Sequence, residues 1–360
     1  MNISVFSTFF EKQHILSESQ NIIGCEKSMK NRRVETADIA RGIAALSVIL
    51  GHLGIWNINR IVYTFHVPLF FLITGYFMDN RRNVSDFIKR KARSLLVPYY
   101  LTCLVIILIS AFSGLKENRF FYNFAYWMYA SAYGAGDSYT EPFLIIGIGA
   151  IWFLWASFWG SLFLRISLEF SKKQRICWIG LLFVLGYYSS KLIWLPFSIQ
   201  AGFCSTLFMY IGYLFGIYKK RIAELPLNLK KAGAIVIWII WFVFIGTFQS
   251  FWVVHCDFGR GITDIIGCIC ACTAVMMIAD YICQKTYYSR KLLSDLGRNS
   301  LWILCIHVVE MNLIPWRRLA AMTGFSASVQ LFFIILCKLL LDCSGALFMS
   351  RMKQIKKLSV

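Results

Sequence analysis

Ten long apolar segments constrain the fold of this chain more than any other feature of its sequence. A helix needs about 20 mostly apolar residues to cross the hydrocarbon core of a bilayer. Segments of that length or nearly so run approximately over residues 38–56, 61–78, 95–112, 145–164, 177–188, 202–218, 232–248, 261–282, 301–316 and 329–348. Hydrophobic residues make up 58% of the chain and charged residues only 15%, against about 25% charged residues in a soluble domain. The sequence therefore predicts an all-α protein, a polytopic integral membrane helical bundle.

The distribution of lysine and arginine predicts the orientation of this bundle. If the N-terminus is cytoplasmic, every cytoplasmic segment carries more Lys and Arg residues than any outer segment, in agreement with the positive-inside rule. An odd number of helices would break this pattern, so we expect ten helices with both termini cytoplasmic. The expected parts are a cytoplasmic tail over residues 1–36, a membrane domain over 37–350 and a basic cytoplasmic tail over 351–360. One long outer loop is expected over 113–144.

The composition also excludes several classes of partner and site. The formal net charge is +19, but the basic residues lie in short runs between apolar segments, so they indicate topology and no nucleic-acid partner is expected. The 12 cysteines are scattered, mostly inside apolar segments where Cys behaves as a small hydrophobic residue. Cys268, Cys270 and Cys272 are spaced too closely for a typical zinc site. We therefore expect no metal and no disulfide framework.

Ionisable residues inside the first apolar segment are the most informative. Such residues cost roughly 2.5–3.5 kcal/mol on insertion scales, so each one indicates a possible function. Arg41 and His52 are eleven residues apart, which places them on one face of a helix and roughly 16 Å apart along its axis. Asp38 lies on the same stripe and can pair with Arg41. Arg41 alone could be an anchor that extends to the membrane surface, and His52 alone a buried histidine satisfied by a carbonyl, but together they indicate a polar path across the membrane.

The second apolar segment places His66 about one helical turn from its outer end. This depth matches that of His52, so the two imidazoles could face each other. Pro68 removes a backbone hydrogen bond at the same level, which a membrane helix tolerates only where other groups satisfy the backbone. The sequence therefore predicts a pair of histidines near the outer side of the membrane.

Further polar candidates lie later in the chain. His307 and Glu310 share one face of the ninth segment, with His307 near the middle of the membrane. Lys338 and Asp342 are four residues apart in the tenth segment, and a mutual ion pair is the structural explanation for them. Trp152 follows a Gly-rich stretch, where it either packs or lies beside a bound polar ligand.

Several of these residues lie in motifs that resemble a known family. The stretch 38–52, in which ten residues separate Arg41 from His52, resembles the signature first helix of the membrane acyltransferase-3 family. The stretch 65–76 is also similar, although Thr74 stands where members usually have Ser. Further family-like elements follow in the expected order, namely the basic stretch 89–93 leading to 97–99, the element 152–154 and the stretch 297–307. The set resembles in particular the sugar O-acetyltransferase branch, which includes fucose 4-O-acetylase-like proteins.

The resemblance implies a membrane enzyme, an acyltransferase of the cell (plasma) membrane, surrounded by lipids. Its reaction would transfer an acyl group, usually acetyl from acetyl-CoA, to a hydroxyl of a cell-surface or exported glycan. The family's Arg and His correspond to Arg41 and His52. We expect the phosphates of acetyl-CoA to meet Arg41, Lys89, Arg90 and Arg93, because Lys and Arg side chains bind phosphate well.

His52 is the expected catalytic residue. A neutral imidazole is suited to remove a hydroxyl proton near neutral pH, so His52 is assigned as general base. A covalent acetyl-imidazole intermediate is an alternative that the sequence leaves open. His66 is expected to orient His52 or to stabilise the oxyanion. The acceptor is either a glycan or a lipid-linked sugar.

Two other functions remain as alternatives. A secondary transporter or flippase would also line a substrate path with polar residues, but transporters often contain internal repeats, and none is evident in this sequence. A membrane scaffold without chemistry leaves the alignment of Arg41 with His52 unexplained. The sequence therefore favours acyl transfer.

Overall fold

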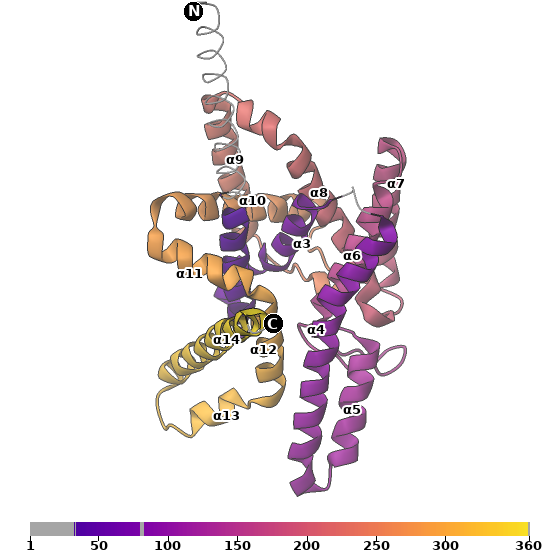
Figure 1. Cartoon of the computed structure of the whole chain (residues 1–360), viewed down its shortest axis with the longest axis vertical. Helices are drawn as coiled ribbons and strands as arrows, with labels where there is room; N and C mark the ends of the chain where they lie inside the picture. The colour runs from indigo at the N-terminus through magenta and orange to yellow at the C-terminus, as the bar shows by residue number, and fades with distance from the viewer. Residues whose placement is uncertain (1–31, 33, 80–82, 359–360) are drawn as a thin grey trace, which may run out of the picture.

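The computed structural model describes residues 32, 34–79 and 83–358, and it shows a bundle of helices (Figure 1). Nearly all of the expected N-terminal tail lies outside the described residues, as do Arg81 and Arg82. The first helix covers residues 34–51. It is followed by α2 (Trp56–Val62), α3 (His66–Tyr76), α4 (Val84–Ser113), α5 (Phe120–Tyr133), α6 (Trp152–Ser167), α7 (Lys172–Ser189), α8 (Ile199–Glu224), α9 (Leu227–Gly246), α10 (Ile262–Lys285), α11 (Tyr287–Arg298), α12 (Ser300–Leu313), α13 (Trp316–Ala321) and α14 (Ala327–Leu358).

The described helices include six stretches that are long and apolar enough to cross a membrane. These stretches are Trp56–Tyr76, Val84–Glu117, Pro196–Glu224, Leu227–Gly246, Ile262–Lys285 and Ala327–Met352. The helix over 34–51 and α7 coincide with predicted segments but each carries three charged residues toward its N-terminal end, and α6 and α12 are shorter. The structure thus agrees with a multi-pass helical membrane protein, while ten spans and cytoplasmic termini stay predictions.

The predicted outer loop over 113–144 contains a helix of its own. A short 3-10 turn (Gly114–Glu117) leads into α5, which packs antiparallel against α4 (Figure 1). The sequence of α5 contains neither Gly nor Pro. Gly134 then ends the helix in the left-handed conformation, with φ 69°, which glycine adopts without a steric penalty. The irregular part of this loop therefore begins at Gly134.

Glycines allow close helix contacts in the core. A Cβ atom on Gly75 of α3 would lie 1.7 Å from the carbonyl oxygen of Met209 in α8, and one on Gly212 would lie 1.9 Å from that of Leu72. Small residues bring membrane helices together in this way. Gly297 of α11 approaches Asp38 of the first helix to the same degree. These contacts fix the position of the first helix, directly after which His52 lies, and of α3, which begins with His66.

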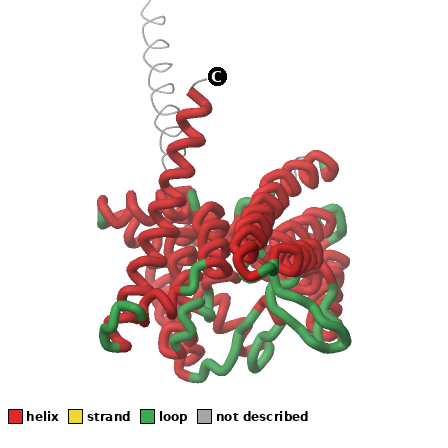
Figure 2. Tube along the Cα trace, turned by 90° about the horizontal axis from the view of Figure 1, so that it is seen from below, coloured by secondary structure: helices red, strands yellow, loops and turns green. Residues whose placement is uncertain are grey.

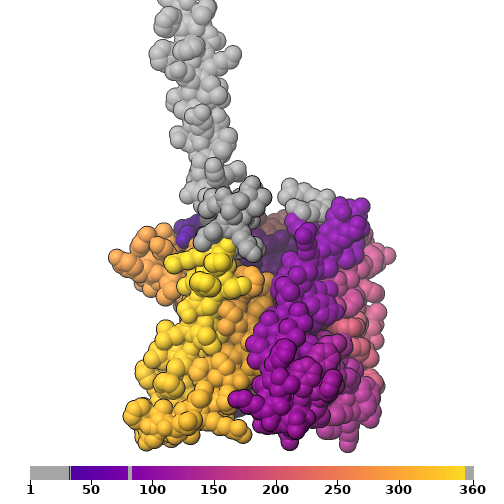
Figure 3. Space-filling view, turned by 60° about the horizontal axis from the view of Figure 1, so that its bottom comes forward, coloured from indigo at the N-terminus to yellow at the C-terminus, as the bar shows by residue number. Residues whose placement is uncertain are grey.

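The last helix, α14, covers α12 on one side. In Figure 3, α14 lies on the same face of the molecule as α4, and α12 packs against both. Much of α14 is exposed and apolar, as at Phe332, Leu340 and Phe348, which suits contact with lipid. The charged residues near the middle of this stretch, Lys338 and Asp342, are buried instead.

Candidate active site

A single cavity of about 240 Å³ joins most of the polar residues singled out from the sequence. The first helix, α3, α4, α6 and α12 form its walls, together with residues 251–254 that precede α10. Most of its lining is apolar. The basic, imidazole and indole side chains that line it are Arg41, His52, His66, Lys91, Trp152, Trp252 and His307.

One end of the cavity is basic. Arg41 bonds to Asp38 at 3.0 Å between Nη1 and Oδ1, as the spacing of the two residues predicts. Its guanidinium lies over the ring of Phe77, 5.8 Å from the ring centre. Lys91 of α4 lines the cavity too and lies near enough for its charge to interact with that of Arg41. The two cations make this end suitable for a negatively charged group.

The basic stretch on α4 contributes a different residue from those selected by sequence. Lys89, Arg90 and Arg93 are exposed and are not part of the cavity wall, whereas Lys91 is. Lys91 shares a helix face with Leu95, which also lines the cavity, because residues four apart lie on one side of a helix. The presence of Leu95 on the same helix face is the sequence feature that could have identified Lys91 as a residue facing the protein interior. The role of the other three in binding phosphate stays a prediction.

The other end of the cavity contains imidazoles. His52 is exposed to the cavity, and its Nδ1 lies 2.8 Å from the carbonyl oxygen of Val48. His66 is buried, with Nδ1 2.7 Å from the carbonyl oxygen of Val62. Both face the same cavity, but the imidazole in contact with His52 is that of His307, with ring centres 5.1 Å apart. His52 therefore pairs with His307 of α12, and not with His66 as the sequence predicts.

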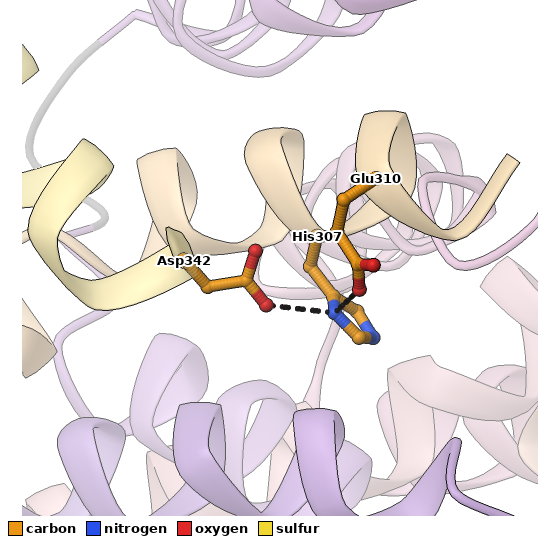
Figure 4. A group of neighbouring side chains, drawn as sticks. All are labelled: His307, Glu310 and Asp342. Atoms are coloured by element: carbon orange, nitrogen blue, oxygen red, sulfur yellow. Dashed lines mark hydrogen bonds and ion pairs between the residues drawn. The ribbon is translucent and has the colours of Figure 1, made fainter. Parts of the chain in front are cut away.

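Behind His307 lies a group of buried charged side chains from two helices. Nδ1 of His307 is 2.9 Å from Oδ2 of Asp342 and 2.9 Å from Oε1 of Glu310. Figure 4 shows both carboxylates converging on this nitrogen. Nζ of Lys338 lies 2.7 Å from Oε1 of Glu310, and Trp316 donates its indole N–H to the other oxygen of Glu310. We call His307, Glu310, Lys338 and Asp342 the α12–α14 charge cluster.

This cluster corrects the predicted ion pair within α14. Lys338 bonds to Glu310 and Asp342 bonds to His307, and no ion pair joins Lys338 to Asp342 in the described part of the chain. The spacing of four residues does place both side chains on one face of the helix. That face is turned toward α12, which supplies an opposite charge for each.

Comparison with models of known protein families identifies the family of this chain. The family described as acyltransferase domain matches residues 34–343, which include the first helix, every wall of the cavity and the α12–α14 charge cluster. This chain belongs to the membrane acyltransferase-3 family. It is also 27% identical over 160 residues to the nodulation protein NolL of Mesorhizobium japonicum. That match covers 39% of this chain and 38% of the length of NolL. No solved structure matches the chain.

In this acyltransferase-family protein, loops cover the imidazole end of the cavity. Most of the loop segments gather on one side of the molecule, away from the C-terminus (Figure 2). Trp252, 44% exposed, lines the cavity and contacts Tyr63, which in turn packs edge-on against His66. The indole of Trp252 thus lies at the entrance to the imidazole end. Trp152 lines the cavity from the start of α6.

A hydrogen-bonded group holds these loops together. His255 bonds through Nε2 to Oδ2 of Asp137, at 3.2 Å, and through Nδ1 to the hydroxyl of Tyr139, at 2.9 Å. The hydrogen bond from His255 lowers the pKa of Asp137, and burial raises the pKa of Tyr139. This group was not predictable from the sequence, because its members come from loops more than a hundred residues apart and lie in no periodic pattern.

Proposed function

We propose that this membrane protein transfers an acetyl group, or a related acyl group, from cytoplasmic acyl-CoA to a hydroxyl of a cell-surface or exported glycan at the plasma membrane. One observation carries the proposal: a single cavity has two cations at one end and His52 at the other. A transferase whose two substrates enter from opposite sides of a membrane needs such a passage between them.

The basic end is suited to the donor. Coenzyme A carries several phosphate charges, and Arg and Lys side chains form strong charge-assisted hydrogen bonds with phosphate. Arg41 and Lys91 would hold these groups at the cytoplasmic entrance. The three helical turns between Arg41 and His52, roughly 16 Å, are of the same order as an extended pantetheine arm. The largely apolar walls suit that arm and the acyl chain.

His52 supplies the chemistry at the other end. The acceptor hydroxyl oxygen attacks the thioester carbonyl carbon, and His52 takes the hydroxyl proton as the carbon–oxygen bond forms. The tetrahedral intermediate then breaks its carbon–sulfur bond, and His52 returns the proton to sulfur, so that the products are an ester and free CoA thiol. A positioned general base contributes about 10²- to 10⁴-fold in rate. His66 lies close enough to line the same space and to orient the reacting groups.

The loop side is suited to a sugar. Trp252 offers a partly exposed aromatic face at the entrance, and sugar rings pack their C–H groups on such faces. Asp137 has a largely exposed carboxylate nearby on the same loops, held by His255, and can accept hydrogen bonds from sugar hydroxyls. These contacts would place a sugar hydroxyl next to His52.

The test compares surface glycan from cells with the wild-type gene, the deleted gene, and His52→Ala. Mass spectrometry and NMR would detect O-acyl groups on the glycan. Loss of the same O-acyl group in both mutants, with normal levels of His52→Ala protein in the membrane, supports the proposal. Unchanged O-acylation in all three would exclude it and favour transport of a substrate through the cavity.

A further inference from the structure

We infer that His307 and Asp342 are positioning residues for His52: they hold its basic nitrogen toward the cavity and stabilise the positive charge that forms on it. This inference rests on the proposed function of His52. It concerns a residue pair on α12 and α14 that the reaction scheme above does not use.

The contacts of His52 determine which of its nitrogens carries the proton. Nδ1 lies 2.8 Å from the carbonyl oxygen of Val48, and a carbonyl oxygen can only accept a hydrogen bond. Nδ1 is therefore the N–H donor of a neutral His52. The proton-free nitrogen, Nε2, is then free of these contacts and available as the base.

The contacts of His307 determine its proton in the same way. Its Nδ1 lies 2.9 Å from a carboxylate oxygen of Asp342 and from one of Glu310, so Nδ1 carries the proton. Its Nε2 lies 3.4 Å from Nδ1 of His52 and, in neutral His307, can share that N–H with the closer carbonyl oxygen of Val48. A directed chain results, in which the shared N–H of His52 points to Val48 and His307, and the N–H of His307 points to Asp342. This is the arrangement of nucleophile, base and orienting group in other transferases and hydrolases, with one additional imidazole.

The charges of the α12–α14 charge cluster also stabilise the positive charge that forms on His52. Glu310 and Lys338 form an ion pair at 2.7 Å and largely cancel each other. Asp342 keeps a net negative charge, and its side chain is fully buried. When His52 accepts the hydroxyl proton, the new imidazolium lies one imidazole ring away from this charge. Charges interact strongly where water is excluded, so the cluster stabilises the transition state.

The surroundings of the histidine pair contain few other titratable groups. Among the described residues, Glu310 comes from α12, Lys338 and Asp342 come from α14, and His66 comes from α3. None of them stands between His52 and His307.

The same cluster has the spacing of a metal site, but its bonds favour a different interpretation. Ligand atoms of His307, Glu310 and Asp342 lie within 4.8 Å of one another. However, the ammonium of Lys338 bonds to one oxygen of Glu310, and the indole of Trp316 bonds to the other. A divalent ion would have to displace or repel that ammonium. The hydrogen-bonded chain accounts for the cluster without a metal.

The first test measures the proton position directly in the wild-type protein. With ¹⁵N-labelled histidine, NMR shifts distinguish the two neutral tautomers, and the chain has only 5 histidines, so His52→Gln assigns the signal. The inference requires His52 to be protonated at Nδ1. Protonation at Nε2 would overturn it, whatever the activity of the enzyme.

The second test measures acyl transfer by purified full-length protein, with acetyl-CoA and surface glycan as substrates. Asp342→Asn keeps the shape and removes the charge, and we expect kcat to fall by about 10²-fold, the lower end of what a positioned base contributes, with the KM for acetyl-CoA unchanged. Asp342→Glu should recover part of kcat. Asp86→Asn, on the exposed start of α4, serves as the matched control and should resemble wild type.

The outcomes separate this inference from the proposed function. Wild-type protein without any transfer contradicts the proposed function, whereas active wild type with an Asp342→Asn variant of equal kcat contradicts only the role of Asp342. A loss of activity on treatment with a chelator, restored by a divalent metal, would also overturn the inference. If Asp342→Asn does not fold, the kcat of Asp342→Glu and the tautomer of His52 in the wild-type protein still test the positioning role.

Discussion

Arg41 lies in the first helix and His52 directly after the end of that helix, eleven residues further along the chain, and both line the same cavity. Asp38 holds the guanidinium of Arg41 from the preceding turn, and His307 contacts the imidazole of His52 from another helix. Each of the two residues is therefore fixed by a partner. Under the proposed function, the distance between them is of the same order as the arm of the acyl-CoA donor, and this relationship leads to the following predictions.

Removing the cations at the basic end should weaken donor binding. A hydrogen bond to a charged group contributes roughly 1.5–3 kcal/mol, so Arg41→Ala and Lys91→Ala should each raise the KM for acetyl-CoA by about ten- to a hundredfold. The KM for the acceptor should change little. Lys172→Ala, a basic residue at the start of α7, serves as the control.

The exposed residues of the same α4 stretch provide a sharper comparison. Because Lys91 lines the cavity and Arg93 does not, Lys91→Ala should raise the KM more than Arg93→Ala does. An equal or larger effect of Arg93→Ala would show that the donor binds outside the cavity, along the exposed face of α4.

Removing the indole at the loop side should weaken acceptor binding instead. Aromatic contacts contribute roughly 0.5–1.5 kcal/mol beyond burial, so Trp252→Ala should raise the KM for the glycan by about two- to tenfold. The KM for acetyl-CoA should stay constant. Trp56→Ala is the matched control, since Trp56 is also exposed but does not line the cavity. Equal effects of the two variants would argue against an acceptor site at Trp252.

The loops held by Asp137 and His255 should become less stable at acid pH. The pKa of Asp137 is lowered by its hydrogen bond with His255, so the carboxylate stabilises the folded loops at pH values above about 3.9, its ordinary pKa. This contribution is lost as the pH falls through the lowered value. Hydrogen exchange of the segment 134–151 should therefore differ between wild type and Asp137→Asn at pH 6, and the difference should shrink as the pH falls below the ordinary pKa of the carboxyl. A difference that is the same at every pH would contradict this role of Asp137.

The glycine contact between α3 and α8 should be essential for folding. A Cβ on Gly75 would overlap the carbonyl oxygen of Met209, and such overpacking typically costs about 1–3 kcal/mol or more. Gly75→Ala should lower the melting temperature in detergent, whereas Gly180→Ala should not, because nothing lies within 4 Å of that position. Equal melting temperatures would contradict the close contact.

The sequence predicted those features that depend on local pattern. Hydropathy located the apolar helices, and the spacing of Arg41 and His52 placed both on one helix face. His307 and Glu310 were also recognised, since ionisable residues are costly in a membrane. In each case the signal lies within one helix and is readable from the periodicity of the chain.

The sequence could not predict contacts between helices or between loops. The partner of His52 is His307, 255 residues away, and not His66 in the next helix. Lys338 and Asp342 bond to α12 because of how α14 packs, which their spacing cannot reveal. Within the basic stretch of α4, the residue that enters the cavity depends on the rotation of that helix, so Lys91 was missed. The helix α5 lay inside a predicted loop because its 14 residues are fewer than the roughly 20 that a membrane-spanning segment needs.

The central claim is that His52 catalyses acyl transfer from acyl-CoA, and it is best tested on purified full-length protein in lipid vesicles. Acetyl-CoA with a labelled acetyl group and isolated surface glycan are supplied, and labelled glycan is measured over time for wild type, His52→Ala and the control His14→Ala, an N-terminal histidine. We predict labelled ester with wild type and His14→Ala, and none above background with His52→Ala. Equal labelling by His52→Ala, at matched amounts of folded protein, would contradict the account.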